Sequence, residues 1–219
     1  MSTKLYYAAG ASSFVPHTLL ELAGIDFEPV NVRLHKGEQE SPEYLAINPR
    51  GQVPALVDGN EVITEIIAII FHIDARFPEK GFIPKEPLAR TRFVETLAWM
   101  NNTVHPTFVH IFRPYKFSDD ETAQAAMKRH ATGQYRKLLE ELQALAAKAR
   151  AAGNDWLGGA SCGPLDTYAL ALLRWGTLAG INPEDYPVLW AHARRTAEVP
   201  AVARVIERER LKLSMYQQA

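Results

Sequence analysis

The chain has 219 residues, of which 47% are hydrophobic and 22% charged, so its composition is that of a globular protein and excludes a disordered tail, a collagen and a coiled-coil rod. This length is enough to bury a hydrophobic core in one large or two small domains. The 24 lysines and arginines are balanced by 25 aspartates and glutamates, and without a basic surplus we expect no nucleic-acid partner.

The first eighty residues predict a mixed α/β unit. Four short apolar runs have the length of β-strands, and two longer stretches carry apolar side chains at helical spacing. Gly10 and Gly24 bound the turn and helix that follow the first strand, and Asp58-Gly59 is a hairpin turn between the last two strands. The predicted strands are 4–8, 27–32, 53–57 and 61–63, and the predicted helices are 14–23 and 64–77.

Three prolines divide this unit from a second one. Pro78, Pro84 and Pro87 lie close together, a density that suits a linker better than a helix or a central strand. Beyond residue 88 helical spacing dominates, with Ala, Leu, Arg and Glu enriched. We therefore predict an α/β domain over 1–80, a linker over 81–88 and an all-α domain over 89–219. The predicted helices of the second domain are 89–112, 119–152, 164–176 and 187–209.

Several common site motifs are missing from the sequence. Gly10 is followed by no second glycine until Gly24, and no Gly-Lys-Ser/Thr occurs, so neither a dinucleotide fingerprint nor a phosphate loop is present. His105 and His110 are five residues apart, which places them on different sides of a helix. We therefore expect no nucleotide chemistry and no metal site.

The cellular compartment follows from three further observations. A single cysteine, Cys162, can form no internal disulfide, which favours a reducing compartment. Residues 1–13 do not resemble a signal peptide, and the longest apolar run, 66–71, is too short to span a bilayer. We expect a cytoplasmic protein without membrane contact.

Three features fall at the ends of predicted strands and helices in the first unit. Ser12 and Ser13 lie in the turn before the first helix, where a hydroxyl either caps the helix or faces a ligand. Pro54 opens a strand, either as an ordinary trans proline or through a cis bond that turns the Val53 amide outward. Glu65 lies where a helix begins. Either its negative charge simply stabilises the first turn of the helix, or its side chain binds an ammonium group while the free amides of the helix start attract a carboxylate. Together these features suit a zwitterionic peptide ligand.

The most specific stretch of the chain is 48–56 (NPRGQVPAL), with Thr64-Glu65 at a fixed spacing behind it. Other characteristic positions are 4–7 (KLYY), 10–13 (GASS), Pro16-His17, Ile63, Ala68-Ile69, Glu95, His105, 112–114 (FRP), 163–166 (GPLD), Tyr168 and 173–175 (LRW). Taken together, these segments cover nearly the whole chain and resemble the glutathione transferases, nearest the bacterial beta class.

The resemblance implies a thioredoxin-like first domain that binds glutathione as co-substrate, a helical second domain that shapes the acceptor pocket, and a homodimer. It implies that the backbone of Val53, before a cis Pro54, pairs with the cysteinyl part of glutathione. Glu65, with the amides of Glu65 and Ile66, is expected to hold the γ-glutamyl end, and Lys36 is expected toward the glycyl carboxylate. The predicted glutathione-binding residues are Lys36, Gln52, Val53, Pro54, Glu65 and Ile66.

The chemistry requires a glutathione thiolate, because the thiol is a weak nucleophile. Ser13 is our first choice for the hydroxyl that stabilises it. Ser12 occupies the position where beta-class enzymes commonly carry a cysteine. The absence of that cysteine favours conjugation over thiol–disulfide exchange. Tyr7 is either a second donor or an ordinary sheet residue. His105 is implied to reach the site from the helical domain.

Aromatic residues of the helical domain are candidates for the acceptor pocket, although such residues on a helix are also typical of a core. We predict a glutathione S-transferase that conjugates small hydrophobic electrophiles in detoxification. The alternatives are a glutathione-dependent reductase or isomerase, and a non-catalytic transferase-like binding module. The acceptor candidates are Trp99, Phe108, Phe112, Tyr115 and Tyr168.

Overall fold

A four-stranded mixed sheet organises the first part of the chain in the computed structural model, which describes residues 3–218. The strand order is β2-β1-β3-β4, with β1 parallel to β2 and antiparallel to β3, and β3 antiparallel to β4. Leu5 of β1 pairs with Leu56 of β3, and both side chains are buried. The strands are β1 Thr3–Tyr7, β2 Glu28–Asn31, β3 Ala55–Asp58 and β4 Glu61–Thr64.

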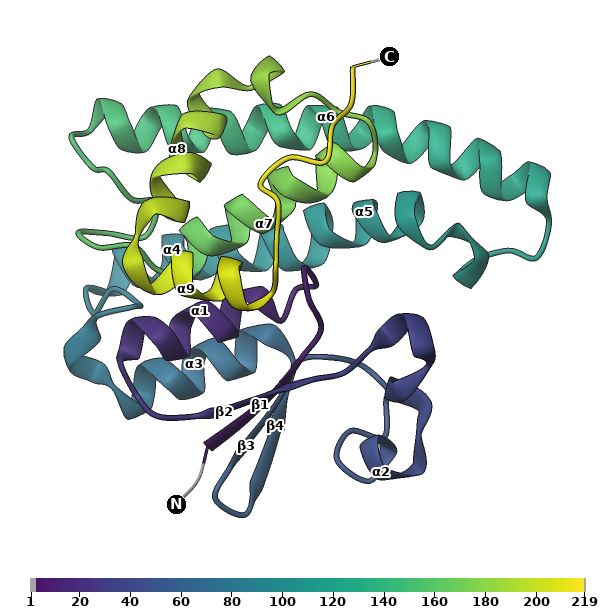
Figure 1. The fold of residues 1–219 in the computed structure, drawn as a ribbon. Coiled ribbons are helices and arrows are strands. Elements are labelled where there is room, and N and C mark those ends of the chain that lie inside the picture. Colours follow the sequence, from purple (N-terminus) through teal and green to yellow (C-terminus); the bar gives the residue numbers. More distant parts are fainter. Residues whose placement is uncertain (1–2, 219) are drawn as a thin grey trace.

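Two helices separate this sheet from the rest of the molecule (Figure 1). Helix α1 (Phe14–Ala23) begins directly after the serine turn and ends at Gly24, whose left-handed φ of 73° closes the helix. Helix α3 (Ile66–Arg76) follows β4 and buries an isoleucine-rich face. The short helix α2 (Pro42–Leu45) lies apart from both in the connection between β2 and β3.

The remaining chain is helical, and the predicted fold class is therefore confirmed. Helix α7 is buried along almost its whole length, as its nearly continuous apolar sequence requires. It packs against α1 on one side and against α6 and α8 on the other, which joins the two parts of the molecule in one hydrophobic core. The helices are α4 Pro87–Trp99, α5 His105–Phe112, α6 Glu121–Ala151, α7 Pro164–Leu178, α8 Pro187–Glu198 and α9 Pro200–Arg208.

Proline explains two differences between the predicted and observed helices. The predicted helix 89–112 is divided by a π-helical turn, Met100–Val104, before Pro106, which has no N–H for a helical hydrogen bond. The predicted helix 187–209 is divided at Val199, which is extended because Pro200 follows it.

The proposed division at 81–88 stays a prediction. Helix α4 begins at Pro87, two residues before the predicted all-α domain, and the Glu86 side chain caps its first turn. Within the described residues, no helix is both long and apolar enough to cross a membrane.

Tyr135→Phe should lower the free energy of unfolding by about 1 kcal/mol, the usual value of a buried hydrogen bond. The Tyr135 side chain is fully buried on α6, and its hydroxyl donates to the Leu172 carbonyl of α7 at 2.7 Å. Urea denaturation measures the loss. Tyr115→Phe, at an exposed position, is the matched control, and an equal effect of both substitutions would contradict the assigned role of this bond.

Candidate functional site

A cleft of about 280 Å³ lies where the serine turn, the β3 entry, the start of α3 and the α4–α5 segment meet. Most of the lining residues of the first domain are polar. The helical wall opposite carries three apolar residues beside Asn101 and His105. The lining residues are Ser12, Asn48, Gln52, Val53, Pro54, Thr64, Glu65, Ile66, Asn101, His105, Pro106, Val109 and Phe117.

The two serines of the turn have different surroundings. Ser12 lines the cleft, two residues before the first residue of α1, and so lies at the positive end of the helix dipole. Ser13 is fully buried, and its hydroxyl accepts from the Ala8 N–H at 3.1 Å and contacts the Ala8 carbonyl at 3.2 Å. The Ser13 hydroxyl is therefore occupied by the backbone of its own turn, and of the two serines only Ser12 lines the cleft.

The segment that enters β3 forms the next part of the wall. The Val53–Pro54 bond is cis, which confirms the expected bond geometry. The Gln52 carbonyl accepts hydrogen bonds from the Tyr44 hydroxyl at 2.6 Å and from the Asn48 side chain at 2.7 Å. These two bonds fix the backbone next to Val53, so that Gln52, Val53 and Pro54 line the cleft together.

The start of α3 supplies the acidic group of the cleft. Glu65 has a φ of 69°, an uncommon value for a residue with a side chain and one that is found most often at functional sites. Its carboxylate is largely exposed, 3.6 Å from the Arg50 guanidinium. Ile66 is buried in the hydrophobic core and also lines the cleft. The first amides of α3 lack helical acceptors and favour an anion.

His105 forms part of the opposite wall, immediately after the π-helical turn. Tyr168 has one hydroxyl proton, which it donates to Oδ1 of Asn101 at 3.2 Å. The His105 Nδ1, 2.9 Å from the same hydroxyl, therefore donates to the Tyr168 oxygen, and Nε2 is left as an acceptor. Burial lowers the pKa of His105 to about 4, so the ring is neutral at pH 7.

The neutral state of His105 predicts a pH dependence of stability. In the unfolded chain the imidazole has a pKa near 6.5, whereas in the folded protein it is about 4, so the unfolded state binds the proton more tightly. This contribution lowers the free energy of unfolding as the pH falls from 6.5 toward 4. Urea denaturation across this range should show a smaller pH dependence for His105→Gln, and NMR titration should give a His105 midpoint well below those of exposed histidines. A midpoint above 6 would contradict the assignment.

The other predicted activating and glutathione-binding residues lie outside the lining. Tyr7 is buried with its ring against His17, at a centroid distance of 4.6 Å, and desolvation raises the pKa of its phenol. Lys36 is exposed on a short 3₁₀ turn, Leu34–Lys36, and its role toward the glycyl carboxylate stays a prediction.

None of the five predicted acceptor residues lines the cleft. Phe108 and Tyr168 belong to the hydrophobic core, and Trp99 packs against it, because their faces of α4, α5 and α7 turn toward neighbouring helices. Phe112 and Tyr115 are exposed beyond the cleft lining. Besides the predicted His105, the helical wall is formed by four residues that were not among the predicted site residues: Asn101, Pro106, Val109 and Phe117.

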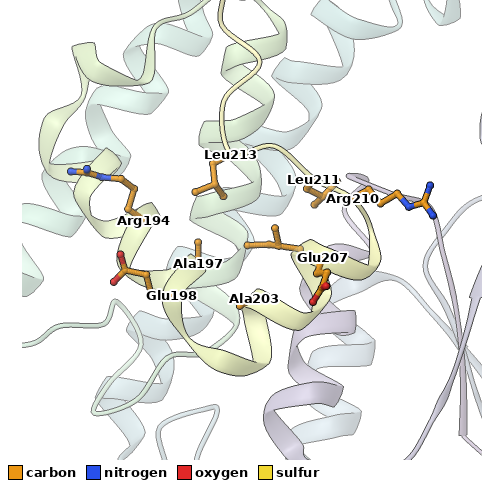
Figure 2. A pocket seen from close by; sticks show the side chains of 9 residues that line it. Arg194, Ala197, Glu198, Ala203, Glu207, Arg210, Leu211 and Leu213 are labelled. Atoms are coloured by element: carbon orange, nitrogen blue, oxygen red, sulfur yellow. The ribbon is translucent and has the colours of Figure 1, made fainter.

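A larger groove of about 460 Å³ lies at a separate place, between α8, α9 and the segment that follows α9 (Figure 2). Figure 2 shows Arg194 and Glu198 on one side and Glu207 on the other, with small and apolar side chains between them. None of the predicted site residues lies in it. Within residues 3–218, no three His, Cys, Asp or Glu side chains are grouped as a metal ion requires.

Comparison with known proteins decides the family. Residues 1–75 match the model of the glutathione S-transferase N-terminal domain. A maleylacetoacetate isomerase of Pseudomonas aeruginosa is 30% identical over 206 residues, which span 90% of this chain and 91% of the relative. The chain belongs to the glutathione S-transferase family. The resemblance found in the sequence is thereby confirmed.

Solved structures of other glutathione S-transferases support this result. A sphingomonad enzyme complexed with glutathione is 33% identical, with a TM-score of 0.80 and coverage of 95% of this chain and 100% of the other. A beta-class glutathione S-transferase of Sphingomonas chungbukensis is 28% identical, with a TM-score of 0.79 and coverage of 94% and 98%. Both alignments extend over nearly the whole of this chain, so the likeness includes the mixed sheet and the helices that follow it.

Proposed function

We propose that this glutathione S-transferase binds glutathione in the cleft and ionises its thiol through the Ser12 hydroxyl. The observation that carries the proposal is that three separate segments of the first domain line one cleft: the serine turn, the cis-proline segment and the start of α3. They supply a hydroxyl, a fixed backbone edge and an acidic group beside free amides. A γ-glutamyl tripeptide has a complementary group for each of them.

The γ-glutamyl end is assigned to the start of α3. Its carboxylate would be bound by the first amides of the helix, including that of Ile66, and its ammonium group by the Glu65 carboxylate. The cysteinyl part would lie along the backbone of Val53, which lines the cleft beside Ser12. This arrangement brings the glutathione sulfur to the positive end of α1.

The free energies involved are sufficient for ionisation. Lowering a thiol pKa by about 2 units requires a preferential stabilisation of the thiolate by about 2.7 kcal/mol. A hydrogen bond to a charged group contributes ~1.5 to 3 kcal/mol, and a helix dipole ~0.3 to 1 kcal/mol. Ser12 and α1 together are therefore adequate without a second side-chain donor.

The acceptor substrate is assigned to the helical wall. Val109, Pro106 and Phe117 provide apolar contacts for a small hydrophobic electrophile, and the neutral His105 provides an acceptor. The thiolate sulfur forms a bond to the electrophilic carbon, and the leaving group departs with its electron pair. Conjugation of this kind suits a role in detoxification.

Glutathione-dependent isomerisation is the second candidate. It is favoured by the similarity to the maleylacetoacetate isomerase. In such a reaction of this chain, the glutathione thiolate would add to the substrate and leave again after rotation about the former double bond, so that glutathione is regenerated. The serine at position 12 suits this chemistry as well, because a hydroxyl stabilises the thiolate without forming a disulfide with it.

Calorimetry and a substrate panel test the proposal. Titration with glutathione should show binding, and the bound thiol should absorb as thiolate near neutral pH. Turnover of aryl halides and epoxides supports conjugation, whereas turnover limited to cis–trans isomerisation of a conjugated acid supports the second candidate. A protein that binds no glutathione would be a transferase-like binding module, and our proposal would be overturned.

We also infer that the protein works as a homodimer in the cytoplasm. The homodimer is supported by the family resemblance, and the cytoplasm by the single cysteine, which fits a reducing compartment. Sedimentation analysis tests the dimer, and a monomeric profile would contradict it.

A further inference from the structure

The turn that carries Ser12 is held at its tip by the distant C-terminal part of the chain. Gly10 donates its backbone N–H to Oε2 of Glu209 at 2.7 Å, and its carbonyl accepts from the Trp175 indole at 2.8 Å. Both polar groups of one residue are therefore bonded to the helical domain. Gly10 also has a φ of 70°, and a Cβ placed there would lie 2.8 Å from the Arg174 guanidinium, so the backbone of this turn packs directly on α7.

The carboxylate of Glu209 is fully buried and has a partner for each oxygen. While Oε2 accepts from Gly10, Oε1 lies 2.7 Å from Nδ1 of His17, a buried residue of α1. On the other side of the ring, the Arg208 guanidinium approaches Nε2 at 3.0 Å. A guanidinium can only donate, so Nε2 accepts and the proton is on Nδ1, which donates to Glu209. Two short bonds to one buried carboxylate thus fix the tip of the turn relative to α1.

The charges around Glu209 support this arrangement. Arg208 forms an ion pair with Glu21 of α1 at 2.6 Å, and Arg204 contacts the same carboxylate at 2.9 Å. Burial lowers the pKa of Arg174, while the charge of Glu209 acts in the opposite direction. The buried negative charge of Glu209 therefore lies among arginines and hydrogen-bond donors, as a stable buried carboxylate requires.

Ser12 lies between two anchored residues. On its C-terminal side, the Ser13 hydroxyl bonds both backbone groups of Ala8 at the base of the turn. On its N-terminal side, Gly10 is held by Glu209 and Trp175. Ser12 itself lines the cleft. The backbone on both sides of Ser12 is therefore held by residues that do not line the cleft.

We propose that Glu209 is a positioning residue of this transferase: by holding the Gly10 amide and the His17 ring, it keeps the Ser12 hydroxyl directed into the cleft. The inference rests on the proposed function of Ser12. Glu209 does not line the cleft, so it would act through the backbone of the turn.

Glu209→Gln is the decisive variant, because it keeps the size of the side chain while only one of its two end atoms can still accept a hydrogen bond. We expect the thiolate fraction of bound glutathione and kcat to fall together by about fivefold, the effect of one lost hydrogen bond. Affinity for S-methylglutathione, which has no thiol to ionise, should stay within about twofold of the original value, since its contacts at α3 are intact. Glu207→Gln, on the same stretch of chain but at the separate groove of Figure 2, is the matched control and should leave all three quantities unchanged.

Amide hydrogen exchange in the ligand-free protein makes the test independent of glutathione. We expect residues 8–14 to exchange faster in Glu209→Gln than in the original protein and in the control. If the original protein neither binds nor ionises glutathione, the proposed function fails, while the exchange measurement still decides on Glu209. Unchanged exchange, an unchanged thiolate fraction, or a loss of activity that follows the loss of S-methylglutathione binding would each overturn the inference.

Trp175→Phe covers the case in which Glu209→Gln does not fold. It removes the N–H that bonds Gly10 and keeps an aromatic ring, smaller than the indole, against His105 and Phe108. Faster exchange over residues 8–14 and a lower thiolate fraction are expected here too. If this variant behaves as the original protein does, fixation of the Gly10 turn by the helical domain is not required, and the proposal is overturned.

Discussion

Ser12→Ala should raise the pKa of glutathione bound to this transferase and lower kcat/KM by about 10- to 100-fold, the value of one hydrogen bond to a charged sulfur. The reason is geometric: Ser12 is the serine of the turn that lines the cleft. Affinity for S-methylglutathione should change little, because that ligand carries no thiolate. The thiolate absorbance of the bound tripeptide, followed against pH, measures the effect directly.

Ser13→Ala is the matched control for this substitution. It removes a buried hydroxyl that contacts both backbone groups of Ala8, so we expect a loss of stability with the bound thiol still ionised. Thermal unfolding and thiolate absorbance separate the two effects. A Ser13→Ala protein that is stable but has lost thiol ionisation would restore Ser13 as the donor and contradict the assignment of Ser12.

Glu65→Ala should weaken glutathione binding by about tenfold at low salt, because the ammonium group of the ligand loses its carboxylate partner. The exposed position of this side chain makes the attraction sensitive to ionic strength, so the difference from the original protein should shrink at high salt. Calorimetry at two salt concentrations measures it. At saturation, the thiolate fraction should be unchanged, since Glu65 is assigned to the opposite end of the ligand from the sulfur.

Glu61→Ala is the control for this charge. Glu61 is an exposed acid at the start of β4, outside the cleft lining. Its removal changes the net charge by the same amount as the removal of Glu65. Equal weakening by both substitutions would show a general effect of protein charge, and the assignment of the γ-glutamyl end to Glu65 would then be wrong.

The sequence predicted the polar side of the cleft better than the apolar side. Ser12, Val53 and Glu65 lie in turns and at element ends, where local signals such as a proline, a glycine or a first helical turn identify backbone groups left free. The element order of the first domain was predictable for the same reason, whereas the cis bond before Pro54 was expected from the family resemblance, since the local signals left both bond geometries open.

The apolar wall depends on the rotation of helices, which periodicity does not fix. Phe108 lies in the core, whereas Val109, the next residue, lines the cleft. The π-helical turn before Pro106 sets the rotation of α5 and thereby which of its faces is directed toward the cleft. Our proposal prefers Ser12 to Ser13 for a related reason. The two adjacent serines have the same chemistry. Only the three-dimensional path of the turn shows that the Ser13 hydroxyl, and not that of Ser12, bonds the backbone of Ala8.

The double anchor of Gly10 on Glu209 and Trp175 also limits how such chains can be recombined. The bonds that shape the serine turn are supplied by α7 and by the residue that follows α9, far along the chain. A hybrid that joined the first eighty residues to the helical half of a relative would fold each half with its own hydrophobic pattern. It would ionise glutathione well only if the borrowed half brought an acidic and an indole-like group to the same two backbone atoms.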